Sequence, residues 1–319
     1  MKKMLICGAN GFIGKNLVQY FVDKYKIRAV DINLSPEENS NIEWVCADLR
    51  KAEEVKKVME GIDVVLHYAA TTTGAADIVS KPYIHVTDNA VMTSLLIREA
   101  FEQHVEHFVM PSCTIMYQSS DNPVKETDFK EEEGILPKYF GAGNTKVYLE
   151  KMCQFFSRFE RTKHTVLRQS NIYGPYDKFD LNKGHVFGAT VAKVMNSDDK
   201  ITVWGTGEEE RDLLHVSDLI NCIELTLDKQ ESYYELLNVG LGKSTPISDL
   251  VKMIVSVSGK ILKIEYDEAK PTIKTKLAVD VSRAKQLFGW EPQISLEGGI
   301  IKTLEWYKKG ETNDNSRTN

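Results

Sequence analysis

The chain has 319 residues, 42% of them hydrophobic and 27% charged, which excludes a disordered chain and allows one large domain or two closely packed lobes. Lys and Arg number 40 against 46 Asp and Glu, so the formal net charge is −6. Because a nucleic-acid surface needs a surplus of cations on one face, this balance argues against a nucleic-acid partner.

The cysteines and the apolar runs give a second set of exclusions. The five cysteines lack the paired spacing of a metal site, so we expect reduced thiols and no bound metal. Residues 1–3 lead directly into a strand pattern without the features of a signal peptide. No apolar run reaches the roughly 18 to 20 residues that span a membrane. The sequence therefore predicts a cytoplasmic protein without a membrane partner.

The first half of the chain alternates strand-like apolar runs with helix-like stretches. Strand patterns cover residues 3–9, 27–32, 42–48, 63–70, 107–113 and 164–170. Helical spacing places Leu17, Val18, Phe21 and Val22 on one face, and further helical patterns cover residues 52–61 and 91–103. This alternation predicts an α/β fold with a Rossmann-type, doubly wound parallel sheet and helices on both of its faces.

The alternation stops near residue 171, where Pro and Gly interrupt the pattern at Pro175, Gly184, Gly205 and Gly207. Residues of about 215–230 again have a helical pattern, which we expect to pack back on the first lobe. We assign residues 1–170 and this returning helix to a dinucleotide-binding Rossmann domain. Residues 171–214 and 231–310 form a smaller mixed α/β substrate-binding lobe, and 311–319 a flexible tail. The cleft between the lobes is the expected site.

A glycine-rich turn follows the first strand. Gly8, Gly11 and Gly14 have the spacing G-x-x-G-x-x-G between a strand and a helix, which lets a pyrophosphate approach the helix N-terminus. Asp31 ends the next strand, where its carboxylate can accept hydrogen bonds from both ribose hydroxyls and repel a 2′-phosphate. Asp31 could instead only cap the following turn. The pattern favours NAD over NADP.

The spacing of these glycines resembles that of the extended short-chain dehydrogenase/reductase family, specifically its NAD-dependent nucleotide-sugar epimerases and dehydratases. Further motifs agree between residue 2 and about residue 308, among them "CADLR", "LHYAAT", "NAVMTSLL" and "RQSNIYGP". The resemblance implies NAD as the cofactor. It also implies that the cofactor is surrounded by Asn10, Phe12, Ile13, Ile32, Asp48, Leu49, Tyr68, Ala69, Ala70, Thr71, Asn89, Ser112, Lys146 and Gln169, together with the three glycines and Asp31.

The second lobe resembles the GDP-sugar enzymes of this family, typified by GDP-fucose synthase. The resemblance implies that the substrate contacts Asn171, His185, Val186, Lys193, Val203, Trp204, Arg211 and Lys276, with His185 at the sugar, Lys193 and Arg211 at the diphosphate, and Trp204 at the base. An indole ring buries a large area against a purine, and an arginine fork matches a phosphate. The alternatives are core packing for Trp204 and a structural salt bridge for Arg211.

The motif that carries the family's catalytic tyrosine lacks that residue here. "FGAGNTKVYLE" aligns with Y-x-x-x-K, with Lys146 and Glu150 in place and Ala142 at the tyrosine position. In the family the tyrosine exchanges the substrate proton, while the lysine binds the nicotinamide ribose and lowers the pKa of the tyrosine. Either the tyrosine was removed by engineering or its absence is natural. The flanking Gly141 and Gly143 favour a natural absence.

Other side chains near this motif are candidates for catalysis. Cys113 stands at the family's Ser/Thr position and Thr114 follows it, and the resemblance places His185 near the sugar. Thr114 is the leading polar contact, because a thiol is a poor hydrogen-bond donor. Tyr139 lies three residues before the missing tyrosine, about 300° round the helix, so its hydroxyl would approach from another direction. Thr114 and Ile115 stand where the dehydratases carry Asp-Glu, so we do not expect water elimination.

The combination of these segments resembles a small atypical group of enzymes for bacterial capsule and O-antigen sugars, which includes a GDP-heptose 4-dehydrogenase without the tyrosine. This implies an NAD-dependent enzyme that oxidises C4 of a GDP-sugar, a GDP-heptose. Two alternatives stay open: a GDP-sugar epimerase or epimerase/reductase that has lost its tyrosine, and a non-catalytic NAD-binding sensor. A pure sensor would have little need for His185, Lys193, Trp204 and Arg211 in this order.

The helical patterns at residues 89–103 and 143–159 each carry an apolar stripe. Relatives of this fold pair the corresponding helices across a two-fold axis into a four-helix bundle. We therefore expect a homodimer or a homotetramer.

Overall fold

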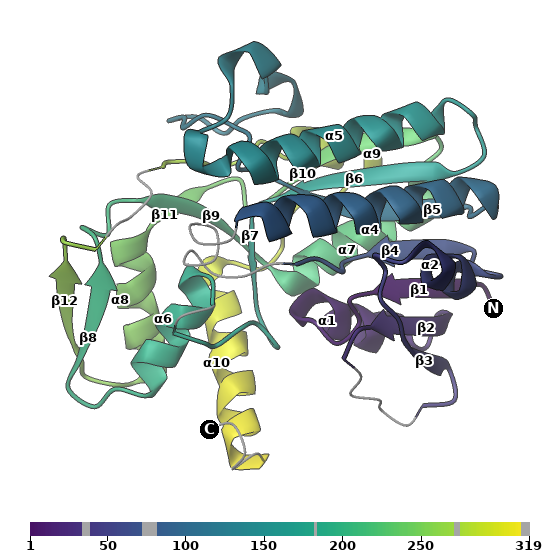
Figure 1. Cartoon of the computed structure of the whole chain (residues 1–319). Coiled ribbons are helices and arrows are strands. Elements are labelled where there is room, and N and C mark those ends of the chain that lie inside the picture. The colour runs from purple at the N-terminus through teal and green to yellow at the C-terminus, as the bar shows by residue number, and fades with distance from the viewer. Residues whose placement is uncertain (34–38, 72–81, 182–183, 271–274, 314–319) are drawn as a thin grey trace.

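A seven-stranded sheet forms the centre of the computed structural model, which describes residues 1–33, 39–71, 82–181, 184–270 and 275–313 (Figure 1). Its strands are parallel and follow the order β10-β6-β5-β4-β1-β2-β3. They are β1 Lys3–Cys7, β2 Lys26–Asp31, β3 Ile42–Cys46, β4 Val64–His67, β5 His107–Cys113, β6 Lys163–Gln169 and β10 Tyr234–Val239. The predicted Rossmann-type parallel sheet is confirmed.

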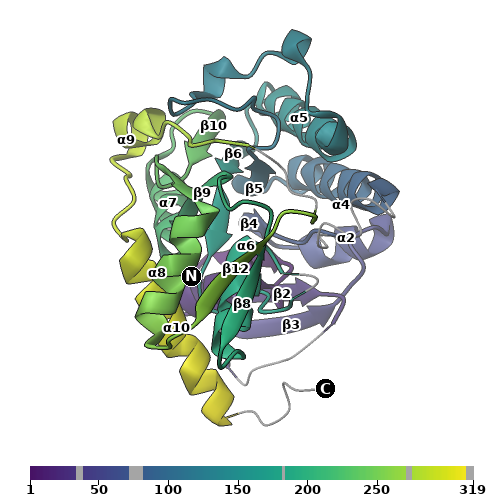
Figure 2. The same ribbon diagram turned by 90° about the vertical axis from the view of Figure 1, so that its left-hand side faces the viewer.

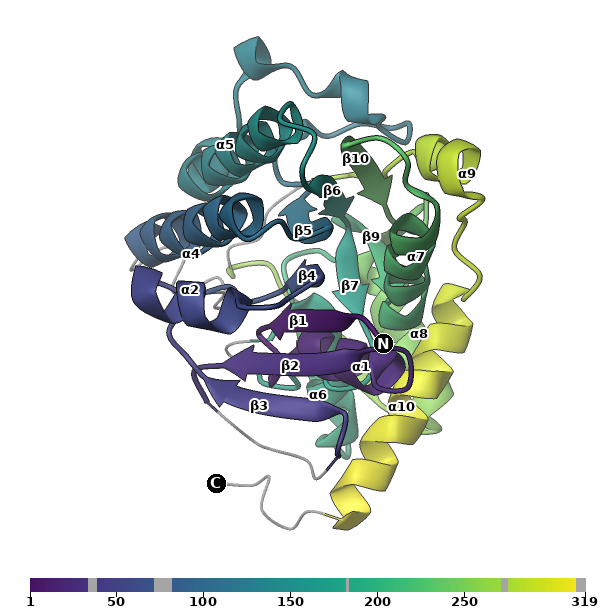
Figure 3. The same cartoon turned by 90° about the vertical axis from the view of Figure 1, so that its right-hand side faces the viewer.

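Helices cover both faces of this sheet (Figure 3). One face is covered by α2 (Ala52–Met59), α4 (Pro82–Glu102) and α5 (Phe140–Ser157), and the other by α1 (Phe12–Phe21) and α7 (Val216–Lys229), with α9 (Ser282–Phe288) beside α7. Because successive residues of a strand point to opposite faces, Met4 and Ile6 join the core under α1 and α7, while Leu5 joins the core under α2, α4 and α5. Burial from both sides is why these strands are near-continuous apolar runs.

A second lobe lies against one end of the sheet (Figure 2). A three-stranded sheet has the order β11-β9-β7, and a parallel pair joins β12 to β8. The elements are β7 Asn171–Tyr173, α6 Val186–Met195, β8 Lys200–Trp204, β9 Glu210–His215, β11 Ser244–Pro246, α8 Ile247–Ser258, β12 Lys263–Asp267 and α10 Leu296–Asn313. Their apolar side chains form a core of their own, with Phe187, Val191, Leu250 and Ile300 fully buried. The predicted smaller α/β lobe is confirmed.

The boundaries of the lobes differ from the prediction in two places. Residues 231–310 are not one lobe, because β10 pairs with β6 in the central sheet and α9 packs near it. The predicted tail is helical at its start, since α10 continues to Asn313; the remainder lies outside the described residues. In the part of the chain that the structure describes, no helix is both long and apolar enough to span a membrane.

The topology places the functional residues at one edge. The strand order reverses between β1 and β4, and parallel sheets bind ligands at the carboxyl ends of the strands beside such a reversal. Cys113 and Gln169, the last residues of β5 and β6, lie opposite each other at this edge. Asn171 follows directly and begins β7, so the chain passes here from the sheet into the second lobe. Short 3-10 helices, η1 Glu126–Asp128, η2 Glu131–Glu133 and η3 Pro137–Tyr139, lie between β5 and α5.

Candidate active site

The glycine turn forms the backbone of the predicted cofactor site. Gly8 has a φ of +76°, which residues with a side chain rarely adopt. A Cβ on Gly14 would lie 2.0 Å from the carbonyl oxygen of Gly8, so glycine is what lets α1 begin this close to β1. Gly11 is the N-cap of α1 and has no side chain that could cover the helix end. The first N–H groups of α1 are therefore available to the oxygens of a pyrophosphate.

Asp31 lies beside this turn at the end of β2. Its Oδ2 accepts the backbone N–H of Asn10 at 3.0 Å, and its Oδ1 accepts the N–H of Asn33 at 3.1 Å. These two bonds fix the carboxylate, and each oxygen keeps a further lone pair for a ribose hydroxyl. Ile32 next to it is exposed and offers an apolar surface at the same edge. Asp31 thus both caps the turn and remains able to bind a ligand.

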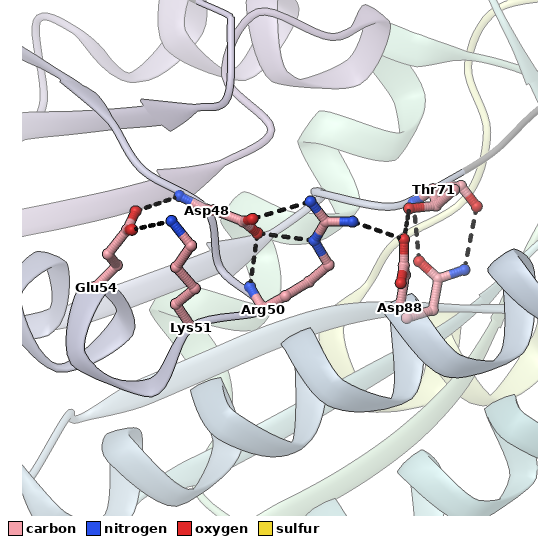
Figure 4. A network of polar contacts seen from close by, with 7 residues as sticks. Asp48, Arg50, Lys51, Glu54, Thr71 and Asp88 are labelled. Atoms are coloured by element: carbon pink, nitrogen blue, oxygen red, sulfur yellow. Dashed lines mark hydrogen bonds and ion pairs between the residues drawn. The ribbon is translucent and has the colours of Figure 1, made fainter.

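Asp48 belongs to a network of charges that links the loop after β3 to α4 (Figure 4). The guanidinium of Arg50 binds both oxygens of Asp48 at 2.9 Å and Asp88 Oδ2 at 3.0 Å. These contacts hold the pKa of Asp48 at about 2. Asn89 accepts the N–H of Thr71 at 2.9 Å and donates to its carbonyl oxygen at 3.2 Å. Both ends of the Asn89 amide therefore position the Thr71 backbone.

Among the other predicted cofactor residues, Leu49 is buried, whereas Phe12, Ile13, Tyr68 and Ala69 are partly buried. Leu49 packs in the core under α2, α4 and α5, so its side chain is removed from the surface. Tyr68 and Ala69 follow β4, and a Cβ on Gly8 would lie 2.7 Å from the nitrogen of Ala69. Phe12, Ile13 and Tyr68 pack against the core under α1 and α7. This close packing brings the ends of β1 and β4 together at the reversal of strand order.

Lys146 and Ala142 lie on α5, one helical turn apart. The Lys146 ammonium donates to the carbonyl oxygen of Pro111 at 2.8 Å, and burial lowers its pKa. Ala142 is partly buried and has no titratable group. Ser112 donates to the carboxylate of Glu150, which is also on α5. The predicted cofactor contact of Ser112 is thus left to its backbone, because its hydroxyl is committed to a buried carboxylate.

Glu150 forms a buried ion pair with Arg168 of β6. The guanidinium donates to the two carboxylate oxygens at 3.0 and 2.7 Å, and both side chains are almost fully buried. Arg168 also donates to the Tyr117 hydroxyl at 2.9 Å, which in turn donates to Asn238 Oδ1 at 2.7 Å. This network joins α5 to β5, β6 and β10 beneath the edge of the sheet. It explains why Glu150 accompanies Lys146 on one helix.

Two buried acceptors at this edge lack partners in the described part of the chain. They are Asn10 Oδ1 in the glycine turn and Gln169 Oε1 at the end of β6. An unsatisfied buried acceptor costs about 1–3 kcal/mol, a cost that a bound ligand removes. Together with the glycine cradle and the fixed carboxylate of Asp31, these acceptors fit a dinucleotide that extends along the carboxyl edge. The residues of the site therefore fit NAD.

A pocket of about 90 Å³ lies where the sheet meets the second lobe. It is lined by Thr114, Ile115, Tyr117, Ser119, Leu136, Tyr139, Ser170, Asn171, Arg211, Asp212, Thr275, Leu277 and Val279. The structure thus brings together the predicted residues Thr114, Asn171 and Arg211 with Tyr139. Cys113 ends β5 one residue before Thr114, and burial raises the pKa of its thiol to about 11, so the thiol is protonated at neutral pH.

The cations that were expected at the diphosphate differ in their surroundings. Arg211 lines the pocket and is held there by hydrogen bonds to the Thr275 carbonyl oxygen at 3.1 Å and to its hydroxyl at 2.7 Å. Lys276 instead binds Asp121 at 3.2 Å and Glu210 at 3.3 Å. These two carboxylates raise the pKa of Lys276 and already balance its charge. Arg211, which lines the pocket while Lys276 is not among its lining residues, is therefore the stronger candidate for an anion bound there.

The remaining predicted substrate residues lie in the second lobe outside this pocket. His185 is the N-cap of α6 and is followed by Val186. The residue is exposed overall, but desolvation of the ring by the surrounding protein and the positive charge of Lys178 lower its pKa. The Lys193 ammonium lies 5.6 Å from the centre of the Trp204 ring, and Trp204 is 48% exposed. Val203 is buried in the core of the lobe, so only its backbone can contact a base. The structure does not show His185 or Trp204 in the pocket with Thr114.

Asp212 and Ser170 are two of the lining residues that sequence reasoning missed. Asp212 is buried in β9, and its carboxylate accepts the N–H groups of Leu241, Gly242 and Val279 at 2.7 to 3.1 Å. Its signal in the sequence was a charged residue next to Arg211 in an apolar strand. Ser170 lies between β6 and β7, and nothing in its local pattern distinguishes it from a connecting residue.

Comparisons with known proteins agree with this geometry. GDP-L-fucose synthase of Azorhizobium caulinodans is 27% identical over 97% of both chains, and GDP-L-colitose synthase of Yersinia pseudotuberculosis is 23% identical over 98% of this chain and all of that protein. The structure of UDP-glucose 4-epimerase from Thermotoga maritima, solved with UDP-glucose, superimposes with a TM-score of 0.85 over 97% of this chain and 99% of that chain at 24% identity. That likeness shows the fold.

A family model decides the assignment. The model of the NAD dependent epimerase/dehydratase family matches residues 4–240, which include the glycine turn, Asp31, Lys146, Asn171 and Arg211. The predictions of NAD as the cofactor and of an enzyme of the extended short-chain dehydrogenase/reductase type are confirmed by this match and by relatives that act on nucleotide sugars. The chain belongs to the NAD-dependent epimerase/dehydratase family.

Proposed function

We propose that the chain is an NAD-dependent nucleotide-sugar dehydrogenase that oxidises C4 of a GDP-sugar, a GDP-heptose, for capsule or O-antigen polysaccharide. The observation that carries this proposal is the pocket in which Thr114, from the end of β5, meets Asn171 and Arg211 of the second lobe. The side chain that we assign to the sugar hydroxyl and the cation that we assign to the diphosphate thus line one pocket beside the carboxyl edge of the sheet. This is what oxidation of a sugar linked to a diphosphate requires.

The choice of guanine nucleotide and sugar rests on similarity. Two relatives that match almost the whole chain are named for GDP-sugars, GDP-L-fucose synthase and GDP-L-colitose synthase. The heptose rests on the resemblance of the segments around Ala142 to the tyrosine-lacking enzymes. Oxidation is favoured over water elimination because Ile115, which lines the pocket, has no acid to offer.

The chain's own residues would divide the work as follows. NAD, when bound, supplies the acceptor for a hydride. The turn from Gly8 to Gly14 would bind its pyrophosphate, Asp31 its adenosine ribose, and Lys146 its nicotinamide ribose. Arg211 anchors the substrate diphosphate, and Thr114 orients the hydroxyl at the carbon that is oxidised. Holding the reacting groups in a near-attack geometry supplies a large part of the rate enhancement.

The test is a screen of nucleotide sugars with NAD, followed by the absorbance of reduced nicotinamide. We expect a signal with a GDP-heptose, a weaker one with other GDP-sugars, and none with UDP- or dTDP-sugars. Thr114→Val should slow the reaction, because the hydroxyl of Thr114 no longer orients the substrate. A signal that is strongest with a UDP-sugar would show that the assigned nucleotide is wrong.

Two further outcomes identify the alternatives. An epimer of the added sugar without accumulation of reduced nicotinamide would identify an epimerase. Tight binding of NAD without conversion of any nucleotide sugar would identify a non-catalytic NAD-binding protein. Mass spectrometry and chromatography of the reaction mixture, beside calorimetry with NAD alone, separate these cases.

A further inference from the structure

The pocket between the lobes contains few groups that can exchange a proton. Its titratable side chains are Tyr117, Tyr139, Arg211 and Asp212. Arg211 keeps its proton under all ordinary conditions. The Tyr117 hydroxyl is buried, donates to Asn238 at 2.7 Å and accepts from Arg168 at 2.9 Å. Tyr117 is thus committed to the network beneath the sheet edge and cannot turn to a substrate.

Asp212 is also committed to the structure. Its carboxylate accepts three backbone N–H groups, from Leu241, Gly242 and Val279, and the residue is 2% exposed. A Cβ on Gly240 would lie 2.6 Å from Asp212 Oδ2, which shows how tightly the chain closes over it. The carboxylate therefore holds the segments after β10 and before α9 in place.

Tyr139 is the remaining titratable group. Its side chain lines the pocket and is partly exposed, and within the described residues its hydroxyl has no hydrogen-bond partner. The guanidinium of Arg211 and the thiol of Cys113 are both close enough to act on it electrostatically. The Lys138 ammonium lies 5.9 Å from the centre of its ring. The phenol thus shares one pocket with Thr114, which follows β5, and with the cation that we assign to the diphosphate.

The local chain geometry holds Tyr139 in this place. It ends η3 and directly precedes α5, so its backbone is constrained from both sides. A Cβ on Gly141 would lie 2.8 Å from a methyl of Val86, and one on Gly143 would lie 2.9 Å from Ile135. These glycines let the first turn of α5 close on α4 and on the segment before η3. The two glycines that flank Ala142 therefore have a packing role in the first turn of α5, which begins directly after Tyr139.

We propose that Tyr139 is the proton-transfer residue of this site, from a different backbone position than the family's missing tyrosine. The inference rests on the proposed function. Oxidation breaks the C–H bond of the carbinol carbon, whose hydrogen leaves with both electrons to NAD, and the O–H bond, whose proton passes to the Tyr139 phenolate oxygen. A ketone, NADH and a protonated Tyr139 result, and the phenol then releases its proton to water.

Two opposing effects act on the Tyr139 phenol. Burial raises its pKa, and the positive charge of Arg211 offsets part of this rise, because it stabilises the phenolate. Lys138 adds a second positive charge beside the ring. In the reverse direction the protonated phenol donates to the ketone oxygen. Tyr139 and Ala142 together thus explain how the fold can lose one tyrosine and retain a proton-transfer group.

The test compares Tyr139→Phe with a control variant, Tyr233→Phe. The control also removes a tyrosine hydroxyl, but Tyr233 is far from the lining residues in the sequence and is 37% exposed. Tyr139→Phe should lower kcat about 10²- to 10⁴-fold, as loss of a positioned base does. The KM for the GDP-sugar and the affinity for NAD should stay unchanged, and Tyr233→Phe should behave as the unaltered protein. An unchanged kcat in Tyr139→Phe would overturn the proposal.

A second measurement does not depend on turnover. 3-Fluorotyrosine at position 139 reports its surroundings by fluorine NMR. We expect addition of GDP to shift its resonance, because the Arg211 guanidinium then exchanges its present hydrogen-bond partners for the phosphates of GDP. Fluorine lowers the pKa of the phenol, so in the active protein the acidic limb of the rate profile should move to lower pH. The role of Tyr139 would be overturned by a fluorine resonance that does not shift when GDP is added. It would also be overturned if the acidic limb of the pH–rate profile stayed at the same pH in the fluorinated protein.

These readouts separate the two proposals. If the unaltered protein oxidises no nucleotide sugar, the proposed function is wrong and the role of Tyr139 is wrong with it. If the unaltered protein is active and Tyr139→Phe is equally active, the function stands and only the assignment of the proton-transfer residue fails.

Discussion

The backbone N–H of Asn10 donates to Asp31 Oδ2 at 3.0 Å, which ties the glycine turn to the end of β2. This bond holds a negative charge at the place where the adenosine ribose of a dinucleotide would lie. A 2′-phosphate would meet that charge at short range. The relationship between these two residues therefore sets the choice between NAD and NADP.

We expect NAD to bind more tightly than NADP by about 1–3 kcal/mol, the repulsion of like charges near a protein surface. Asp31→Ala should lower the affinity for NAD, because it removes the acceptor for the ribose hydroxyls. It should also narrow the difference in affinity between NAD and NADP, because it removes the repulsion of the 2′-phosphate. Calorimetry with the two nucleotides gives the affinities. Glu43→Ala is a suitable control, since Glu43 on the neighbouring strand pairs with Lys3 and Arg28. Equal affinities in the unaltered protein would contradict the assignment.

Arg211 and Lys276 should differ in their effect on nucleotide binding. Arg211→Met should make the free energy of GDP binding less favourable by about 1.5–3 kcal/mol, which is the contribution of a hydrogen bond to a charged group. Lys276→Met should weaken GDP binding much less than Arg211→Met does, because Lys276 is already paired with Asp121 and Glu210 on the surface. Titration with GDP and UDP gives both values. A larger loss in Lys276→Met would mean that these ion pairs open to admit the ligand.

The fold and the site were predictable to different degrees. The strands of the central sheet and the glycine turn follow from periodicity and from glycine spacing, which are local properties of the chain. The membership of β10 in that sheet is not local, since its partner β6 lies about seventy residues earlier, in a register that joins Tyr234 to His164. The pairing of Lys276 with two carboxylates and the position of Tyr139 in the pocket likewise depend on distant segments.

Asp177 should make the stability of the protein depend on pH. It is buried, its Oδ2 has no hydrogen-bond partner in the described residues, and burial raises its pKa to about 7. In the unfolded chain the pKa of an aspartate is about 3.9. Between these values the folded protein binds more protons than the unfolded chain, so this group lowers stability as the pH rises from about 4 to about 7.

Asp177→Asn should remove this dependence, because the amide is neutral at every pH and its oxygen can still accept the N–H of Lys178. We expect the variant to gain about 1–3 kcal/mol over the unaltered protein at pH 8 and little at pH 4. Urea unfolding at both pH values measures the difference. A gain of equal size at both would show that the effect is not one of protonation.

The outer surface of α4 and α5 should form an interface between two copies of the chain. Tyr148, Phe155 and Phe159 on or just after α5 and Val91 on α4 are exposed, and the two helices lie side by side (Figure 1). Phe155→Glu should shift the mass measured by light scattering towards the monomer, because it places a charge in an apolar contact. Leu287→Glu on α9, at the other face of the sheet, is the matched control and should not change the mass. A monomeric unaltered protein at micromolar concentration would contradict the expected dimer.

Ala142→Tyr tests whether the site has adapted to the absence of a tyrosine at this position. Lys146 lies one turn later and donates to the Pro111 carbonyl oxygen, so a tyrosine removed by engineering would find its lysine in place. Restoring it should then raise kcat by about 10²- to 10⁴-fold. If the absence is natural and Tyr139 transfers the proton, the added phenol should leave kcat unchanged or lower it, because it enters a partly buried position on α5 and Tyr139 already lines the pocket. Measuring Ala142→Tyr in the presence and absence of Tyr139→Phe decides between the two: a rise only in the double variant would show that one phenol suffices and that either position can supply it.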